Sequence, residues 1–222
     1  MDVFTNKSVV VTGAAGALGL TVANAFAHAG ANVTGIDVVN FKADFTTLKA
    51  NLIELESTKT ALAQVQSVDV LVNIAGGFTM GDTVASTSDE TWDFMFDLNA
   101  RTVLNTVRTI VPVMVEQGAG KIINIGARAA LRGSANMAAY AASKSVVIRL
   151  TESLADELKH QGINVNCILP SIIDTERNRA DMPDADFSSW VSPEALAKVV
   201  LFLASPESNP IHGAALPVEG LA

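Results

Sequence analysis

The sequence predicts one α/β domain, with a doubly wound parallel sheet of about seven strands and helices on both faces. Three observations predict it. The chain has 222 residues, 49% of them hydrophobic, which suffices for one sizeable core but not for two typical domains. Aromatic residues are scarce, at 5%, which suits helices packed closely on a parallel sheet. Short apolar runs also alternate with longer segments of helical spacing, so residues 1–222 are treated as a single domain.

The first half of the chain begins with a strand, a glycine turn and a helix. Residues 7–12 are a β-branched run that ends at Gly13, as expected of a strand buried on both faces. Apolar residues then recur at helical spacing over residues 18–29, and a second short strand is expected at residues 31–36, ending before Asp37. The rest of this half is expected to contain a short strand near residues 42–45, a helix at residues 48–64 and a fully apolar strand at residues 68–74.

The second half repeats the alternation with longer helices. A helix over residues 89–116 leads to a strand at 121–125, and a helix over 138–160 leads to a strand at 163–169. Strands that alternate with long helices imply right-handed crossovers and one parallel sheet. Residues 175–192 break this pattern with Asp, Arg, Pro and Ser, and are expected to form a substrate loop or lid. The chain closes with an expected helix at residues 193–204 and strand at residues 214–218.

The net charge and the cysteine content argue against several classes of function. The net charge of −8 is spread along the chain, which argues against binding to nucleic acid or to an anionic membrane. No secretory signal and no apolar run of ~18 residues is readable, so a cytoplasmic location is expected. The single cysteine, Cys167, lies in an apolar run and is expected to be a buried structural thiol. No metal site is expected.

Residues 12–19 read Thr-Gly-Ala-Ala-Gly-Ala-Leu-Gly and join the first strand to the first helix. Glycines at this place let the backbone turn tightly and approach a pyrophosphate at the helix N-terminus, as in Rossmann-type domains. An ordinary tight turn is the alternative, but the flanking strand and helix favour nucleotide binding. The residues expected to bind the cofactor here are Gly13, Gly16, Leu18 and Gly19.

Asp37 is expected at the end of the second strand, 18 residues beyond Gly19. An acidic side chain there can accept hydrogen bonds from an adenosine ribose, whereas its charge would repel a 2′-phosphate. No arginine stands beside Asp37 in the sequence. The sequence therefore predicts NAD(H) in preference to NADP(H).

Several motifs, taken in order, resemble the short-chain dehydrogenase/reductase family over essentially the whole chain. They are the glycine turn, the segment Asn73-Ile-Ala75-Gly76, Asn99, the segment Tyr140-Ala-Ala-Ser-Lys144, and the segment Pro170-Ser-Ile-Ile-Asp-Thr175. The resemblance implies a nicotinamide-dependent oxidoreductase with Tyr140, Lys144 and Asn99 as its catalytic residues. It also implies that the cofactor contacts Asp44, Asn73, Ala75, Gly76, Lys144, Pro170 and Thr175.

Tyr140 and Lys144 are four residues apart on an expected helix and so share one face. An ammonium close to the phenol would favour the phenolate and lower the pKa of Tyr140 toward a working range. By resemblance, Lys144 also binds the nicotinamide ribose, and Asn99 holds a water that relays protons. Likewise by resemblance, Asp44 meets the adenine, although a plain turn role is equally open.

Asn73 and Thr175 also have ordinary structural alternatives. Asn73 is expected to fix the backbone around the cofactor, and Thr175 to hold the nicotinamide carboxamide. Both side chains could instead stabilise turns.

Two features distinguish this chain within the family. Ala127, 13 residues before Tyr140, stands where most members carry a serine that binds a substrate carbonyl. Alanine at that position, together with residues 35–39, 126–131 and 182–190, resembles one group of the family, the dihydropteridine reductases. Asn99 is instead typical of ordinary members, so the chain combines features of both.

The leading hypothesis is reduction of a quinonoid dihydropteridine or a similar activated acceptor, because such an acceptor needs fewer donors than a ketone. Ala127, Arg128 and Trp190 are the expected substrate-binding residues, with Arg128 or Ser134 as possible replacement donors and lid packing as the alternative for Trp190. The rival hypotheses are a conventional alcohol dehydrogenase or ketone reductase, and a non-catalytic nucleotide-binding regulator. A homodimer or homotetramer is expected from the resemblance.

Overall fold

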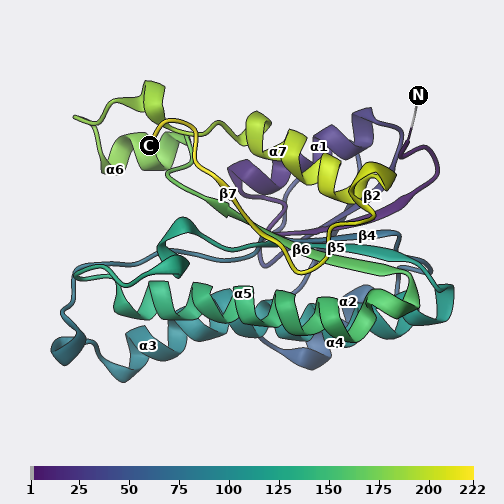
Figure 1. Cartoon of the computed structure of the whole chain (residues 1–222), viewed down its shortest axis with the longest axis horizontal. Coiled ribbons are helices and arrows are strands. Elements are labelled where there is room, and N and C mark those ends of the chain that lie inside the picture. The colour runs from purple at the N-terminus through teal and green to yellow at the C-terminus, as the bar shows by residue number, and fades with distance from the viewer. Residues whose placement is uncertain (1–2) are drawn as a thin grey trace.

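Seven parallel strands form the centre of the computed structural model, which describes residues 3–222 (Figure 1). The strand order is β3-β2-β1-β4-β5-β6-β7, and each neighbouring pair is parallel. The strands are β1 (Ser8–Thr12), β2 (Asn32–Asp37), β3 (Thr46–Lys49), β4 (Val70–Asn73), β5 (Gly120–Ile125), β6 (Ile163–Pro170) and β7 (Ala215–Val218). This confirms the predicted Rossmann-type α/β fold.

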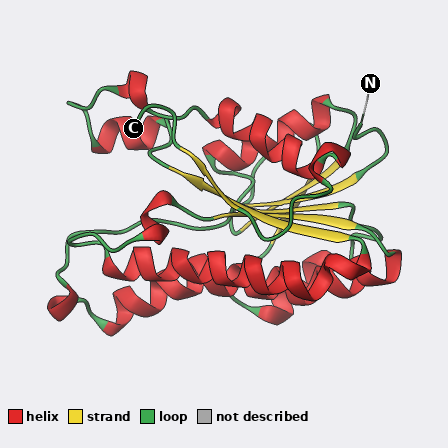
Figure 2. Cartoon of the chain, in the orientation of Figure 1, coloured by secondary structure: helices red, strands yellow, loops and turns green. Residues whose placement is uncertain are grey.

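Helices cover both faces of the sheet, α1 and α7 on one and α2, α4 and α5 on the other (Figures 1 and 2). The helices are α1 (Ala17–His28), α2 (Leu55–Leu62), α3 (Asp89–Phe96), α4 (Thr102–Gln117), α5 (Ala138–Leu158), α6 (Glu176–Asp181) and α7 (Pro193–Ala204). Within β1, Val10 packs toward α2, α4 and α5, whereas Val9 and Val11 pack toward α1 and α7. Strands that are buried on both faces have nearly continuous apolar sequences. For this reason most strand positions could be predicted correctly from the sequence.

Two predicted elements are wrong. The strand expected at residues 42–45 is instead β3, whose register with β2 pairs Thr34 with Thr46. The helix expected at residues 48–64 is only α2, because the chain is still extended through Lys49. Both errors come from the weakest apolar pattern in the sequence, since β3 lies at the sheet edge and contains no fully buried residue.

The long helix expected over residues 89–116 is interrupted. A π-helical segment, Asp97–Arg101, lies between α3 and α4. π-helical insertions are rare and are found frequently at functional sites. Asn99 lies in the middle of this segment and is fully buried.

The sheet positions a site at the carboxyl ends of its central strands. The strand order reverses beside β1, whose neighbours are β2 and β4, and ligands of such sheets bind outside the carboxyl ends at that point. Cys167, on β6, is fully buried, as predicted, and burial raises the pKa of its thiol to about 11. None of the helices described in residues 3–222 combines the length and apolarity needed to cross a bilayer.

Candidate active site

The glycine turn joins β1 to α1 and brings the ends of two strands together. Gly13 has a positive φ of 65°, and a Cβ at this residue would lie 2.9 Å from the amide nitrogen of Ala75. A Cβ at Gly19 would lie 2.0 Å from the carbonyl oxygen of Gly13, so no side chain fits there. The Thr12 hydroxyl oxygen accepts hydrogen bonds from the amides of Ile74 (3.0 Å) and Ala75 (3.1 Å). Gly13 and Ala75, which are far apart in sequence, therefore meet at one edge.

The N-terminus of α1 has room and charge for a dinucleotide phosphate. The N-cap is Gly16, no side chain caps the first amides, and no acidic residue lies in the first turn. Free amides at a helix N-terminus bind anions, and the missing side chains leave space for close approach. The residues present therefore fit the pyrophosphate of a nicotinamide dinucleotide, with Leu18 buried beneath the turn.

Asp37 ends β2 beside this turn. One carboxylate oxygen accepts a hydrogen bond from the amide of Ala15 (3.0 Å), and the other accepts one from the amide of Val39 (3.3 Å). Val38 and Val39 are exposed and uncharged. Asp37 thus places a negative charge at the carboxyl edge of the sheet, next to the glycine turn.

Asp44 does not lie near this edge, so the expectation that it meets the adenine is wrong. It precedes β3 and lines a groove at the opposite, amino edge of the sheet with Ser8 and Asn32, where β1 and β2 begin. Residues that follow β3 lie instead at the carboxyl edge of the sheet, where the amide of Ala50 donates to the carbonyl of Asp37. Among these, Asn51 accepts a hydrogen bond from the amide of Ile53 (3.2 Å) and donates one to Glu54 (3.0 Å).

Tyr140 and Lys144 lie one turn apart on α5, as predicted. The Lys144 ammonium is almost fully buried and donates a hydrogen bond of 2.9 Å to the carbonyl oxygen of Ile125, the last residue of β5. Ala127 follows two residues later and is 5% exposed. The Lys144 ammonium thus lies at the carboxyl end of β5, two residues before Ala127.

The electrostatics of this pair differ from the sequence prediction. Burial raises the pKa of Tyr140 to about 12, whereas the proximity of Lys144 was expected to lower it. Burial also lowers the pKa of Lys144 to about 8. Desolvation opposes the charged form of each group and is the largest cause of both shifts. The phenol is therefore a protonated acid at neutral pH.

Asn99 fixes the backbone beside Lys144. Its side-chain oxygen accepts from the amide of Gly77 (2.9 Å), and its nitrogen donates to the carbonyl of Gly77 (3.1 Å) and to the Ser143 hydroxyl (3.0 Å). A Cβ at Gly76 would lie 2.7 Å from the Asn99 oxygen and 3.1 Å from the Lys144 nitrogen. Only glycine fits between these two side chains, so Asn99, Gly76 and Lys144 form one packed unit.

Asn73 turns its side chain away from the site. It donates to the side-chain oxygen of Asn124 (2.9 Å) and accepts from Thr106 (2.7 Å), and Asn124 in turn donates to Thr151 (2.9 Å). This chain of buried hydrogen bonds ties β4 and β5 to α4 and α5. The Asn73 side chain therefore has a structural role in the core, and a role for its backbone beside a cofactor stays a prediction.

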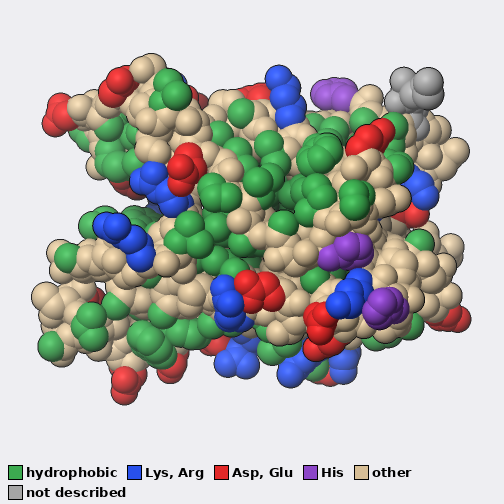
Figure 3. Space-filling view, viewed as in Figure 1, with side chains coloured by type: hydrophobic (Ala, Val, Ile, Leu, Met, Phe, Trp, Pro, Cys, Tyr) green, Lys and Arg blue, Asp and Glu red, His purple; other side chains and the backbone are tan. Residues whose placement is uncertain are grey.

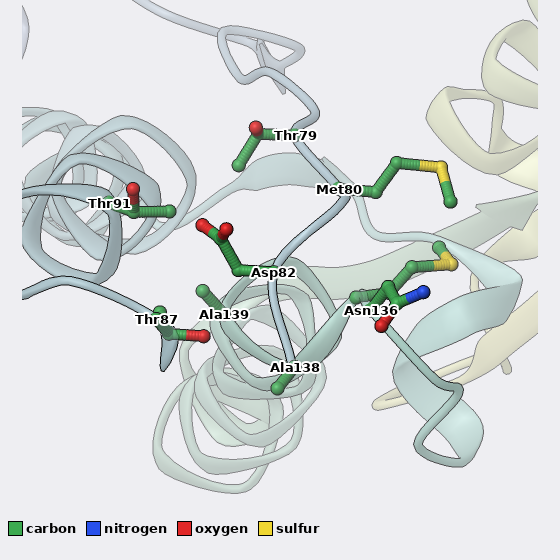
Figure 4. Close-up of a pocket in the computed structure, with 9 residues that line it drawn as sticks. Thr79, Met80, Asp82, Thr87, Thr91, Asn136, Ala138 and Ala139 are labelled. Atoms are coloured by element: carbon green, nitrogen blue, oxygen red, sulfur yellow. The ribbon is translucent and has the colours of Figure 1, made fainter. Parts of the chain in front are cut away.

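Phe78, which was not predicted as a site residue, directly follows Gly77, the residue held by Asn99. Its ring meets that of Tyr140 edge to face, with centroids 4.8 Å apart and planes at 86°, and it is 52% exposed. The same loop is braced against the start of α5 by a hydrogen bond from the Gly81 amide to the carbonyl of Asn136 (2.9 Å). Figure 4 shows Asp82 pointing into a small pocket between this loop and α5. The signal available in the sequence was an aromatic residue directly after a pair of glycines.

The side chains of Arg128 and Trp190 both contact other residues of the protein. The Arg128 guanidinium donates a hydrogen bond of 2.7 Å to the backbone oxygen of Ala222, near the end of the chain. Trp190 is 8% exposed and packs against Phe187, with ring centroids 4.8 Å apart. Substrate contact by these two side chains stays a prediction. Trp190 makes the lid packing that was its alternative, and Arg128 has a partner distant in sequence.

Pro170 and Thr175 lie on either side of the loop that follows β6. Pro170 is buried at the end of β6, where it pairs with Val218 of β7. The Thr175 hydroxyl oxygen caps α6 by accepting from the amide of Asn178 (3.2 Å). The capping role is the structural alternative left open for Thr175, and its hydroxyl hydrogen is still available to a ligand.

A family model described as short chain dehydrogenase matches residues 7–186. The chain belongs to the short-chain dehydrogenase family. It is therefore an oxidoreductase of that family, with the fold that its members use to bind nicotinamide dinucleotides.

Members of the family with different substrates are similarly close to this short-chain dehydrogenase. The 3-oxoacyl-[acyl-carrier-protein] reductase of Chlamydia muridarum is 31% identical, with 99% of this chain and 98% of the relative covered. Dehydrogenase/reductase SDR family member 6 of Rattus norvegicus is 30% identical, with 96% of each chain covered. A putative NAD(P) dependent gluconate 5-dehydrogenase from Beutenbergia cavernae, solved with NADP bound at low occupancy, is 28% identical with a TM-score of 0.90, over 99% of this chain and 98% of that one.

Proposed function

We propose that this enzyme uses NADH to reduce a flat, activated acceptor of the quinonoid dihydropteridine class, with Tyr140 as the acid. The observation that carries the proposal is the make-up of the site around that phenol. Ala127 provides a methyl group where most family members place a hydroxyl donor, and Phe78 provides an aromatic edge. Tyr140 is thus the donor that this arrangement offers to an acceptor.

A single donor suits an acceptor that is already electrophilic. Removal of one oxyanion-hole donor typically costs ~10²–10³ in rate, so an ordinary ketone would react slowly at this site. A quinonoid dihydropterin takes up hydride readily and needs only one protonation to complete the reduction. Phe78, which is 52% exposed, also offers a flat heterocycle an aromatic surface next to Tyr140.

Tyr140, Lys144 and Asn99 each have a distinct role in the proposed reaction. When bound, the dinucleotide supplies the hydride. Tyr140 gives its proton to the reduced acceptor, and Lys144, through its buried ammonium, binds the nicotinamide ribose and takes part in returning that proton. Asn99 holds Gly77, and so Phe78, in place. Residues 175–192, which contain α6, form the lid over the acceptor.

The pKa of Lys144 predicts the pH dependence of the reaction. Because burial lowers this pKa to about 8, the ammonium is charged below pH 8 and is lost as the pH rises through that value. We expect kcat/KM for NADH to fall about tenfold per pH unit above pH 8. The pKa of Tyr140, raised to about 12, makes no contribution in this range.

Loss of folding would not explain such a fall. Between pH 8 and the ordinary lysine pKa of 10.5, the unfolded chain binds more protons at this position than the folded chain, so the contribution of Lys144 to stability rises with pH. In the variant Lys144→Arg, whose guanidinium stays charged, the decline should move to higher pH. A profile of the wild-type enzyme that is flat from pH 7 to 9.5 would contradict the role given to Lys144.

Restoring the missing hydroxyl tests the proposed specificity. In Ala127→Ser, we expect turnover of a simple ketone to rise by about 10- to 100-fold, because a second donor then faces the carbonyl oxygen. Reduction of quinonoid dihydropterin should change by less than twofold. Ala129→Ser, on the same loop, is the matched control. No gain on ketones, together with a loss on the pterin, would show that Ala127 does not decide between the two acceptors.

The local charge supports NAD(H) over NADP(H). Asp37 holds its carboxylate beside the glycine turn through the amide of Ala15, where the 2′ position of an adenosine ribose would come. The two residues after it are exposed valines, so they offer no cation to a 2′-phosphate. We infer that Asp37 binds the ribose hydroxyls of NADH.

A conventional ketone reductase is the second candidate. The complete Asn99 and Lys144 arrangement favours it, as does the likeness to a 3-oxoacyl reductase. The same arrangement argues against a non-catalytic regulator. We also infer a homo-oligomer, a dimer or tetramer, because α3 exposes the aromatic residues Trp92 and Phe94.

A further inference from the structure

One arginine, Arg128, connects the two sides of the proposed acceptor cleft. One side is the 3-10 turn Arg128–Leu131, which directly follows Ala127 after β5. The other side is the lid, residues 175–192, with the last four residues of the chain beneath it. In Figure 1 the lid and the C-terminus form a lobe beside the carboxyl end of the sheet, above the layer of α3 and α5. Figure 3 shows the surface hollowed between this lobe and that layer.

The end of the chain supports the lid. The amide of Leu221 donates a hydrogen bond of 2.9 Å to the carbonyl of Ser189 in the lid. Gly220 has a positive φ of 64°, and a Cβ there would lie 2.9 Å from the same carbonyl, so the segment lies closely against Ser189 and Trp190. The backbone oxygen of Glu219 accepts a 2.6 Å hydrogen bond from Ser171, which follows β6. Movement of this segment would therefore move the base of the lid.

Arg128 connects that segment to the opposite side of the cleft. Its Nη1 donates to the backbone oxygen of Ala222 at 2.7 Å, and its Nε lies 3.7 Å from a carboxylate oxygen of Glu219. Both side chains are about half exposed. The other ion pairs of lid residues join near neighbours in the sequence, Arg179 with Asp174 just before the lid and Arg177 with Asp181. Of the ion pairs in residues 3–222, the pair of Arg128 with Glu219 is the one that spans the cleft.

We propose that Arg128 is a positioning residue that sets how far the lid stands from Tyr140 and thereby the affinity for the acceptor. The planar guanidinium reaches a carbonyl and a carboxylate together, which a lysine cannot do with the same geometry. A half-exposed link of this kind contributes little to global stability. Its loss should therefore loosen the lid without unfolding the enzyme or disturbing the glycine turn. The effect on acceptor affinity rests on the proposed function, whereas the effect on the lid does not.

Limited proteolysis measures the lid independently of any acceptor. Trypsin cleaves after Arg177 and Arg179, both exposed on α6. We expect Arg128→Gln to be cleaved there about two- to fivefold faster than the wild type, the range set by loss of an exposed ion pair. Arg128→Glu, which repels Glu219, should be cleaved faster still. Arg132→Gln removes an exposed arginine from the same loop and should behave as the wild type.

Kinetics with quinonoid dihydropterin and NADH complete the test. Arg128→Gln should raise the acceptor KM by about two- to fivefold, with kcat within twofold and the Kd for NADH unchanged. Arg128→Lys should recover part of the loss. Unchanged lid cleavage in both Arg128→Gln and Arg128→Glu, or equal acceleration in Arg132→Gln, would overturn the proposal. Faster cleavage in an enzyme that does not turn over the pterin would support Arg128 as the lid support and count against the proposed acceptor alone.

Discussion

Replacement of Tyr140 by phenylalanine is expected to lower kcat by ~10²–10⁴, the usual contribution of a general acid. The substitution removes only the hydroxyl, so the ring still packs edge to face on Phe78 at the present geometry. Binding of NADH should be unchanged, because Lys144 keeps its hydrogen bond to the carbonyl of Ile125. Steady-state kinetics together with a fluorescence titration of NADH measure the two quantities separately.

The titration is the control for this variant. If Tyr140→Phe bound NADH as the wild type does and turned over its best acceptor at the wild-type rate, the assignment of Tyr140 as the acid would be wrong. If NADH binding were lost as well, the ring would have a structural role that the packing on Phe78 does not predict. The melting temperature should stay within a few degrees of the wild type, because no buried group loses its partner.

The variant Gly19→Ala is expected to abolish measurable NADH binding and to destabilise the enzyme. A Cβ on Gly19 would lie 2.0 Å from the carbonyl oxygen of Gly13 and 2.9 Å from the Cα of Ala14. Both contacts are with backbone, so the turn itself must move, and overpacking of this kind costs about 1–3 kcal/mol. The moved backbone would also misplace the amides at the N-terminus of α1. Calorimetry and an NADH titration are the measurements.

Two other glycines serve as matched comparisons. A Cβ on Gly16 would lie 3.4 Å from the carbonyl oxygen of Gly13, and a Cβ on Gly133 would have open space around it. Gly16→Ala should leave the melting temperature near that of the wild type, because the added methyl group has room within the protein. It should weaken NADH binding, because the methyl group would crowd the phosphate of the cofactor. Gly133→Ala should alter neither quantity. Wild-type affinity for NADH in Gly19→Ala would show that the cofactor does not approach this turn.

Much of the fold could be predicted from the sequence because the central strands are buried on both faces. Runs such as Val9–Val11 in β1 and Val70–Val72 in β4, all of whose residues are buried, leave an unambiguous apolar signal. The edge strand β3 gives no such signal. Because this strand was predicted near residues 42–45, Asp44 was expected at the carboxyl edge of the sheet, whereas it lies before β3. Its position is determined by pairing with β2, an interaction between residues distant in sequence.

The candidate site was predictable where spacing along one element suffices. Tyr140 and Lys144 share a helix face because they are four residues apart. The direction of the Tyr140 pKa shift was not predictable in this way, because it depends on burial by other elements. The engagement of Arg128 by Ala222, 94 residues away, and the contact of Phe78 with Tyr140 likewise arise only in the folded chain.

The most direct test of the proposed function is the rate of NADH oxidation by the wild-type enzyme with quinonoid dihydropterin, compared with a simple ketone in the same assay. A site with Tyr140 as donor, Ala127 in place of the serine and Phe78 against the Tyr140 ring should reduce the pterin and leave the ketone essentially untouched. Rapid reduction of the ketone with no activity on the pterin would contradict the account and establish a conventional ketone reductase instead.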